Sequence, residues 1–385
     1  MSGGLKLGRV LRGVGAGLLV SLALGFAPLA HAQTPPAAAA SALPLTPTRK
    51  VTMDTDEGTW VSLDVSPDGR TIVFDLLGDL YRMDAEGGAA HPIAQGLPFE
   101  GQPAFSPDGS MIAFTSDRSG SENIWVARPD GSGMRQVSRN AGPNEYVSPS
   151  WSADGKQVYA SLYRSDRNAI ELWRYSADGS VAASDLTGGA FSALGAKASP
   201  DGRYLYFSAH EGSVFEDDVT LPLWAIHRLD LRTGADETLI TNQGSAMRPV
   251  LSPDGRLLAY AARLGGQTAL RLRDLSTGAD RLLAYPIQRD VQEALPTRDL
   301  VPGYAFTPDG KTILAVYGGK FHRIDVATGA APIEPFSAHI DLDVGPFLRL
   351  PLKTDAGPVV ARLMQAPVQS PDGRRVVFSA LERSR

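Results

Sequence analysis

SPDGRTIVF, residues 66–74, joins a four-residue turn to a short apolar run, and this combination recurs along the chain. Pro presets the backbone of such a turn, Asp bonds nearby amides, and Gly accepts a positive φ. The turn occurs seven times, with successive starts 40, 46, 47, 53, 55 and 63 residues apart. Its Asp-Gly pairs are Asp68-Gly69, Asp108-Gly109, Asp154-Gly155, Asp201-Gly202, Asp254-Gly255, Asp309-Gly310 and Asp372-Gly373. A period of this length indicates a propeller or a repeat array.

Each turn is followed by further strand patterns. Apolar runs rich in β-branched and aromatic residues suit strands that are buried on both faces. Third strands end in Asp-Gly or Thr-Gly turns, as at 123–131 and 270–278, and weaker fourth strands follow, as at 134–138. Four short antiparallel strands per unit form a propeller blade. The sequence therefore predicts an all-β propeller with six clear blades and a seventh that is partial or is closed by residues 49–54.

The N-terminus reads as a processing signal followed by a spacer. Three basic residues precede an apolar stretch at 14–30, and small residues occupy Ala30 and Ala32, which predicts a signal peptide over 1–32 with cleavage between Ala32 and Gln33. The basic residues are Lys6, Arg9 and Arg12. Residues 33–48 are rich in Pro and Ala and predict a linker, and 49–385 the propeller. We expect a periplasmic or secreted protein without a membrane span after cleavage; a retained anchor is the alternative.

Charge and cysteine content exclude several classes. Cleavage would change the formal net charge from -5 to about -8, so no basic surplus exists for nucleic acid as the main partner. The chain has no cysteine, which excludes disulfides, thiolate metal sites and a cysteine nucleophile.

The motifs of familiar catalytic sites are missing from the sequence. The histidines, at positions 31, 91, 210, 227, 322 and 339, form no His-x-His or His-Glu-x-x-His pattern, and no Gly-x-Ser-x-Gly elbow occurs. Asp54, Asp56 and Glu57 resemble the start of a calcium loop, but Gly58 stands where another oxygen ligand is required. We therefore predict no catalytic residue, no metal site and no cofactor within the chain.

Polar segments in the loops suggest contacts of other kinds. Asp117 and Arg118 follow an apolar strand, and we expect a local ion pair that fixes the turn. The acidic loop Glu216–Asp218 is expected to be solvated or to contact a partner or metal. Because the repeats lengthen toward the C-terminus, we expect longer loops on one rim. A protein or small ligand would bind at that rim or at the channel mouth.

The turns and "FTSDRSGSENIWV" (114–126) resemble the TolB-type, WD-like propeller repeat of bacterial periplasmic proteins. Residues 57–81, 247–260 and 303–329 look more specifically like the N-terminal propeller of secreted bacterial amidohydrolases. That resemblance implies a hydrolase domain using zinc or another divalent metal, which these 385 residues do not include. Two principal interpretations follow: a non-catalytic binding scaffold, or a truncated propeller portion of an amidohydrolase. A propeller that gates an α/β-hydrolase peptidase is a third.

Overall fold

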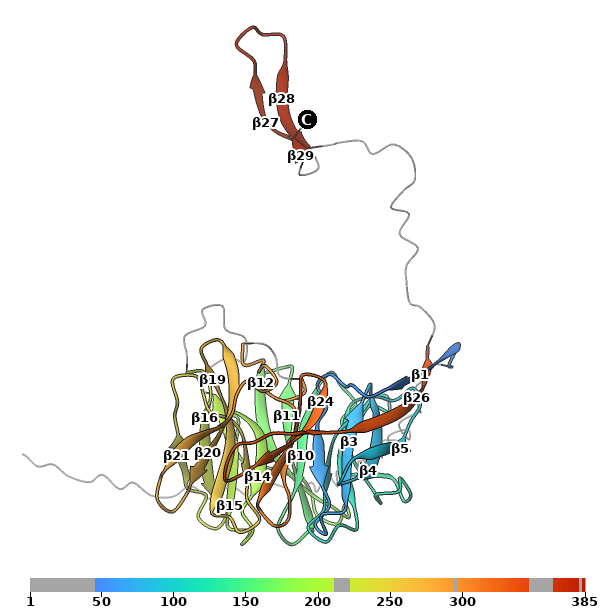
Figure 1. Ribbon diagram of the computed structural model, residues 1–385, viewed down its shortest axis with the longest axis vertical. Helices are drawn as coiled ribbons and strands as arrows, with labels where there is room; N and C mark the ends of the chain where they lie inside the picture. The colour runs from blue at the N-terminus through green and yellow to red at the C-terminus, as the bar shows by residue number, and fades with distance from the viewer. Residues whose placement is uncertain (1–45, 211–221, 294–296, 346–362, 381–382, 385) are drawn as a thin grey trace, which may run out of the picture. The chain divides into compact units, whose positions relative to one another are not determined.

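The computed structural model describes residues 46–210, 222–293, 297–345, 363–380 and 383–384, and these form strands and no α-helix (Figure 1). Six four-stranded antiparallel units occur in chain order, as the turn repeat predicts. The first three blades are β2 Leu63–Val65, β3 Thr71–Leu76, β4 Asp79–Asp84 and β5 Gly88–Ala94; β6 Glu100–Phe105, β7 Ile112–Ser116, β8 Asn123–Ala127 and β9 Arg135–Gln136; and β10 Glu145–Trp151, β11 Gln157–Arg164, β12 Ala169–Ser176 and β13 Ser184–Asp185.

The other three blades have the same order. They are β14 Ser192–Ala198, β15 Tyr204–His210, β16 Ala225–Asp230 and β17 Asp236–Ile240; β18 Met247–Leu251, β19 Leu257–Leu264, β20 Gln267–Asp274 and β21 Asp280–Ala284; and β22 Ala305–Phe306, β23 Thr312–Tyr317, β24 Lys320–Asp325 and β25 Ile333–Glu334. In each blade the repeated turn joins the first strand to the second.

The repeated turns hold themselves together by the same hydrogen bonds. In the first, Ser66 Oγ donates to Asp68 Oδ1 and accepts from the Thr71 amide at 2.9 Å. Asp68 Oδ1 also accepts from the Arg70 amide at 3.1 Å. The Ser66 hydroxyl bond is the main reason that the pKa of Asp68 lies below its usual value. Gly69 has a φ of 73°, which a residue with a β-carbon adopts only at a cost.

Contacts between the repeated turns of neighbouring blades show that the ring closes with six blades. A β-carbon built on Gly109 would lie 3.2 Å from Cδ of Pro67 in the preceding blade. Equivalent approaches join Gly155 to Pro107, Gly202 to Ala153, Gly255 to Pro200, Gly310 to Pro253 and, last, Gly69 to Pro308. Since Gly69 belongs to the first blade and Pro308 to the sixth, the series returns to its start. The Leu63 amide also donates to the Gly303 carbonyl at 3.3 Å across this joint.

Residues 49–54 do not complete a seventh blade, so that alternative was wrong. They lie in β1 (Arg49–Thr55), which pairs antiparallel with β26 (Phe336–Val344), and β26 pairs in parallel with β5. Figure 1 shows β26 reaching the β5 edge of the first blade with β1 beside it. The ring needs no strand from the N-terminus, because the sixth blade contacts the first directly.

Aromatic side chains pack where the ring closes. Phe74 of the first blade lies edge-on to Phe321 of the sixth, with ring centroids 5.0 Å apart, and Phe321 contacts Phe336 of β26 at 4.8 Å. All three are buried. Burial of one such ring stabilises a fold by about 1.5–3 kcal/mol, so this cluster stabilises the joint of blade 1, blade 6 and β26.

The seventh turn lies in a partial blade. β27 (Met364–Gln369), β28 (Val376–Ala380) and β29 (Arg383–Ser384) form a separate three-stranded sheet. Ser370 and Asp372 bond as in the other turns, but the only atom near a β-carbon on Gly373 would be in its own hairpin, on Gln369. The apolar run that follows the seventh turn lies in β28, which is solvent-exposed at Val376 and Val377.

Several predictions lie outside the described residues: the signal peptide with its cleavage at Ala32 and Gln33, the linker up to residue 45, and the acidic loop Glu216–Asp218. Within the described part of the chain, none of the structure is a helix of the length and apolarity needed to span a membrane.

Candidate functional site

One position at or just before the first strand of each blade lies near the propeller axis, and three blades place a hydrogen-bonding side chain there. The position lies four residues before the turn and is occupied by Ser62, Gln102, Ser148, Gly195, Arg248 and Gly303. At the four middle positions φ is positive, between 49° and 65°, and the strand register shifts by a bulge. A bulge of this kind redirects a side chain, here toward the axis.

Hydrogen bonds between non-adjacent blades show that these side chains meet at the axis. Arg248 Nη1 of the fifth blade donates to Ser148 Oγ of the third at 3.0 Å. Ser148 in turn donates its amide to Gln102 Oε1 of the second blade at 2.8 Å. Blades three and five are separated by a whole blade, so a contact between them crosses the centre of the ring.

Asp299 completes this axial cluster from the segment between blades five and six. Its carboxylate forms an ion pair with Arg248 and accepts from Ser148 Oγ. Its side chain is fully buried, and a β-carbon on Gly195 would lie 2.7 Å from Asp299 Oδ2. The absence of a side chain at Gly195 therefore lets the carboxylate reach the axis.

An acidic cavity of about 260 Å³ opens beside the axial cluster, between blades one, two and three. Four carboxylates line it, together with a few neutral groups and one arginine. The acidic residues are Asp75, Asp117, Glu122 and Glu145. They come from the ends of β3 and β7, the turn after β7 and the start of β10, so they lie at the propeller end opposite the repeated turns. We call this site the acidic cavity.

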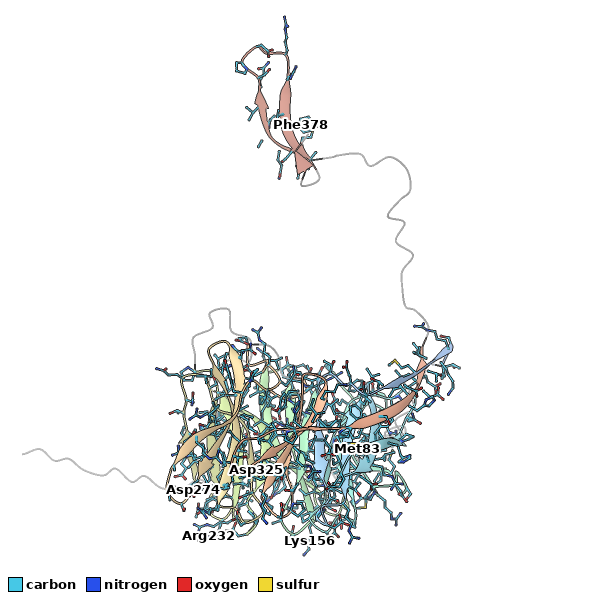
Figure 2. The ribbon with its side chains drawn as sticks, viewed as in Figure 1. Met83, Lys156, Arg232, Asp274, Asp325 and Phe378 are labelled. Atoms are coloured by element: carbon cyan, nitrogen blue, oxygen red, sulfur yellow. The ribbon has the colours of Figure 1, made fainter. Side chains whose placement is uncertain are left out.

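Two labelled side chains mark the propeller end that carries the repeated turns. Figure 2 shows Lys156, next to the third repeated turn, and Arg232, in the turn between β16 and β17, on the same rim of the propeller. The turns between the first and second strands and those between the third and fourth strands therefore share one end. The turns between second and third strands, which carry the acidic cavity, share the other.

Two of the four carboxylates accept hydrogen bonds from backbone amides. Asp75 accepts from the amides of Ser62 at 2.8 Å and Gln102 at 2.7 Å, and Asp117 accepts from the Phe99 amide at 2.8 Å. These carboxylates fix the strand ends around the cavity. Burial raises the pKa of Asp75 to about 6, although both amide bonds lower it.

Glu122 and Glu145 are the carboxylates that remain for a ligand. Burial, with repulsion from Glu145 and Asp117, raises the pKa of Glu122 to about 8. Burial also raises the pKa of Glu145. Two adjacent carboxyls in a partly dry cavity favour a bound proton or a bound cation. The protonated form of Glu122 is therefore favoured over the range in which an exposed glutamate is ionised.

One wall of the acidic cavity combines aromatic and cationic groups. The exposed Arg298 guanidinium stacks over the Phe99 ring, 4.3 Å from its centroid. The Arg298 carbonyl accepts from Trp60 Nε1 at 3.4 Å. Phe99 thus already holds the stem and the charge of one arginine side chain beside the carboxylates.

The predicted ion pair between Asp117 and Arg118 was wrong. Arg118 binds Glu100, with Nε 3.1 Å from Oε1, and its guanidinium also lies over the Trp125 ring. Asp117 caps the Phe99 amide instead. The two residues open a turn in which the Gly120 amide donates to the Asp117 carbonyl at 2.7 Å, and their side chains bond different neighbours.

The other residues considered as ligands have local partners. Asp54 bonds His339, and Lys320 bonds Asp56 and Glu57. His210 stacks on Trp224, His227 bonds Asp236, and His322 stacks on Tyr317. In the part of the chain that the structure describes, no three His, Asp or Glu side chains are arranged to bind one metal ion.

The comparison with known proteins agrees with this architecture. Residues 45–219 match the TolB beta propeller domain family. An uncharacterized protein of Agrobacterium fabrum is 35% identical over 100 residues, which are 25% of this chain and 34% of that protein. The Tol-Pal system protein TolB of Anaeromyxobacter dehalogenans is 32% identical over 104 residues, which are 27% of this chain and 23% of that protein. The matches thus span about a third or less of these relatives' length.

Among solved structures, TolB from Acinetobacter baumannii superimposes with a TM-score of 0.54 at 19% identity, covering 72% of this chain and 65% of that chain. This likeness shows a shared fold. Together with the six-bladed ring and the repeated turns, it shows that the chain is a β-propeller. Over residues 45–219 the chain is similar to the TolB beta propeller domain family.

Proposed function

We propose that this TolB-like propeller is a non-catalytic binding module of the periplasm and that it holds the cationic group of a protein or small ligand in the acidic cavity. The observation that carries the proposal is the pair Glu122 and Glu145 beside the Phe99 surface. Their carboxyls lie at the propeller end where the turns do not repeat, and among the described residues Arg298 is the one cationic side chain that lines the cavity with them.

Proton release supplies a signature of this function. A bound ammonium or guanidinium favours the ionised form of Glu122, whose pKa in the empty cavity is raised to about 8. Binding at pH 7 therefore releases a proton, and the affinity rises as the pH increases from 6 to 9. An uncharged ligand would show no such dependence.

The test is calorimetric titration with N-acetyl-arginine amide and N-acetyl-lysine amide, and with the citrulline amide as the uncharged counterpart. The charged probes should bind and the citrulline probe should not. The double variant Glu122→Gln/Glu145→Gln should weaken binding roughly tenfold or more, since a charge-assisted hydrogen bond contributes about 1.5–3 kcal/mol. Glu86→Gln, an exposed carboxylate at the propeller end opposite the cavity, should bind as the native protein does.

Two further outcomes bear on the proposal. Equal binding of citrulline and arginine, or binding unaffected by the Glu122 and Glu145 changes, would contradict the role of the cavity. Export is tested by N-terminal sequencing of the mature protein from a periplasmic fraction, which should begin at Gln33.

The amidohydrolase interpretation stays a prediction. It rests on the sequence resemblance of residues 57–81, 247–260 and 303–329, and no catalytic constellation in the described residues adds to it. Its assay is hydrolysis of amide and ester substrates with added zinc. The binding-module proposal expects no turnover, and metal-dependent turnover by the purified chain would contradict it.

A further inference from the structure

The partial blade formed by β27, β28 and β29 exposes apolar side chains on both of its faces. Val376 of β28 is 52% exposed and Val377 is 57% exposed, and side chains alternate along a strand, so these two point to opposite faces. Val368, the sheet partner of Val377, is 66% exposed. Because β29 adds only two residues, the sheet is little more than a hairpin, and an isolated hairpin is marginally stable at best in water. The open faces therefore call for a partner.

The partial blade has the local structure of the first two strands of a ring blade. Ala366 lies four residues before the seventh turn, has a φ of 49° and stands at a register shift between β27 and β28. Arg248 has the same φ at the equivalent bulge of the fifth blade. Gly373 has a φ of 69° in its turn, close to the 73° of Gly69 in the first. The partner should therefore be one that a blade accepts.

The ring shows what covers a blade of this repeat. The second strand of each blade carries three apolar residues, at six, seven and eight positions after the first residue of the turn. The middle residue packs with the two outer residues of the next blade, as Val73 does in a buried cluster with Ile112 and Phe114. The other five joints, including the one that closes the ring, follow the same rule: Ala113 with Val158 and Ala160, Tyr159 with Leu205 and Phe207, Tyr206 with Leu258 and Tyr260, Ala259 with Ile313 and Ala315, and Leu314 with Ile72 and Phe74. All of these side chains are 7% exposed or less.

The same three positions of the seventh repeat are Val376, Val377 and Phe378, the last of which is labelled on the hairpin in Figure 2. Val377 has the place of the middle residue, and Val376 and Phe378 have the places of the outer residues. By the rule of the six joints, Val377 fits between the outer residues of another repeat. Its own outer residues accept the middle residue of a further one.

Within the described part of the chain, the seventh repeat is the one that keeps these positions open. Each ring blade already packs against a blade on either side, so the ring has no free middle or outer position to offer. The complement that is free in a solution of this chain is the partial blade of a second copy. We propose that copies of this chain associate by stacking their partial blades, with Val377 of one copy between Val376 and Phe378 of the next.

The direction of stacking predicts how the assembly grows. The contact joins two different faces, so it is a head-to-tail contact. It leaves Val377 free on one copy and Val376 and Phe378 free on the other, and a third copy adds in the same way. Because one hairpin face is a small interface, the association is weak and depends on concentration.

The first experiment is sedimentation velocity of the full mature chain from about 5 µM to about 500 µM. The weight-average sedimentation coefficient should rise with concentration, through dimers to larger species. Val377→Asp should lower the association constant at least tenfold, because a carboxylate would have to enter an apolar contact. The matched control is Leu264→Asp, at an apolar residue of the ring that is 47% exposed, and it should associate as the native chain does.

The tryptophans provide a check that each variant is folded. All five lie between positions 60 and 224, within the ring. The melting temperature followed by tryptophan fluorescence should therefore be the same for Val377→Asp and for the native chain, which separates loss of association from loss of the ring.

A second experiment tests the head-to-tail arrangement by disulfide formation. The chain has no cysteine, so Val376→Cys and Val377→Cys each carry a single thiol. The two positions lie on opposite faces of one hairpin, and the proposed contact brings position 377 of one copy to position 376 of the next. Under a mild oxidant, a mixture of the two variants should form severalfold more disulfide-linked dimer than either variant does alone.

Three results would overturn the proposal. The first is a native chain that is monomeric at every concentration, which would mean that its own chain or another protein covers the partial blade. The second is equal association of the native chain and Val377→Asp. The third is a dimer that does not grow and that forms disulfides within a single variant as readily as in the mixture, which would mean that like faces pair.

Discussion

Replacement of Arg248 by methionine tests the axial cluster. Arg248 and Asp299 form an ion pair with side chains 9% and 0% exposed, and Arg248 also donates to Ser148 at 3.0 Å. Methionine keeps much of the length of arginine and removes its charge and donors. Asp299 would then stay buried with the Ser148 hydroxyl and the Leu300 amide as its remaining donors.

The expected cost follows from the uncompensated charge. Removing one partner of a buried ion pair typically destabilises a protein by about 3–5 kcal/mol. Replacing both partners removes the stranded charge, so Arg248→Met/Asp299→Asn should cost clearly less than the sum of the two single changes, by roughly 2–3 kcal/mol. The axial cluster would thereby be shown to act as one unit across non-adjacent blades.

The assay is equilibrium unfolding in urea followed by tryptophan fluorescence, with the slope m compared between variants. Arg256→Met is the matched control. Arg256 lies in the same blade and binds Asp274 at 2.8 Å, but it is 63% exposed, so solvent already screens its charge. The reasoning is refuted if Arg248→Met costs no more than Arg256→Met, or if the double variant loses the full sum.

Three other expectations concern the turns, the acidic cavity and the first strand. Gly109→Ala should lower the free energy of unfolding, measured in urea, by more than Gly179→Ala does. Both glycines have a positive φ, which costs alanine about 1–2 kcal/mol. Of the two, only Gly109 would bring its new β-carbon against a neighbour, 3.2 Å away on Pro67. A larger loss for Gly179→Ala would contradict the turn-to-turn packing. The raised pKa of Glu122, about 8 in the folded state, means that folding favours its protonated form; this stabilisation is full below the unfolded value near pH 4 and is lost as the pH rises through 8. The melting temperature of the native chain should therefore fall more between pH 6 and 9 than that of Glu122→Gln, and parallel curves would count against the shift. Deletion of residues 1–55 should leave a cooperatively folded ring with a modestly lower melting temperature, because the first and sixth blades contact directly; an unfolded product would show that β1 is needed for closure.

The fold could be predicted because its information is local and repeated. Each turn contains its own stabilising bonds within six residues, as from Ser66 to Thr71, so a short sequence window specifies the hairpin. Repetition of that window then predicts the blades. A short sequence window could not predict how many blades the closed ring contains. That number depends on the approach of Gly69 to Pro308, which lie 239 positions apart.

The candidate site could not be predicted for the opposite reason. Glu122 and Glu145 belong to different blades and to positions that do not repeat. The pairing of Arg248 with Asp299 depends on bulges that redirect single side chains toward the axis. One signal was present: Gln102, Ser148 and Arg248 are polar residues that each precede a proline within an apolar first strand. Proline in a strand marks an irregular position, and a polar neighbour there indicates a side chain turned out of the sheet.

The two ends of the propeller therefore differ in chemistry for a structural reason. At the end with the repeated turns, the aspartates accept hydrogen bonds from a hydroxyl and an amide of their own turn, as Asp68 and Asp254 do. These bonds lower the pKa of the carboxyls. Because these carboxylates already have hydrogen-bond donors, they would contribute little to the binding of a ligand. At the other end burial raises the pKa of both Glu122 and Glu145, and the charges of Glu145 and Asp117 raise the pKa of Glu122 further. Binding energy is available where charge is unsatisfied, so a ligand of this propeller should be sought at the end where the sequence does not repeat.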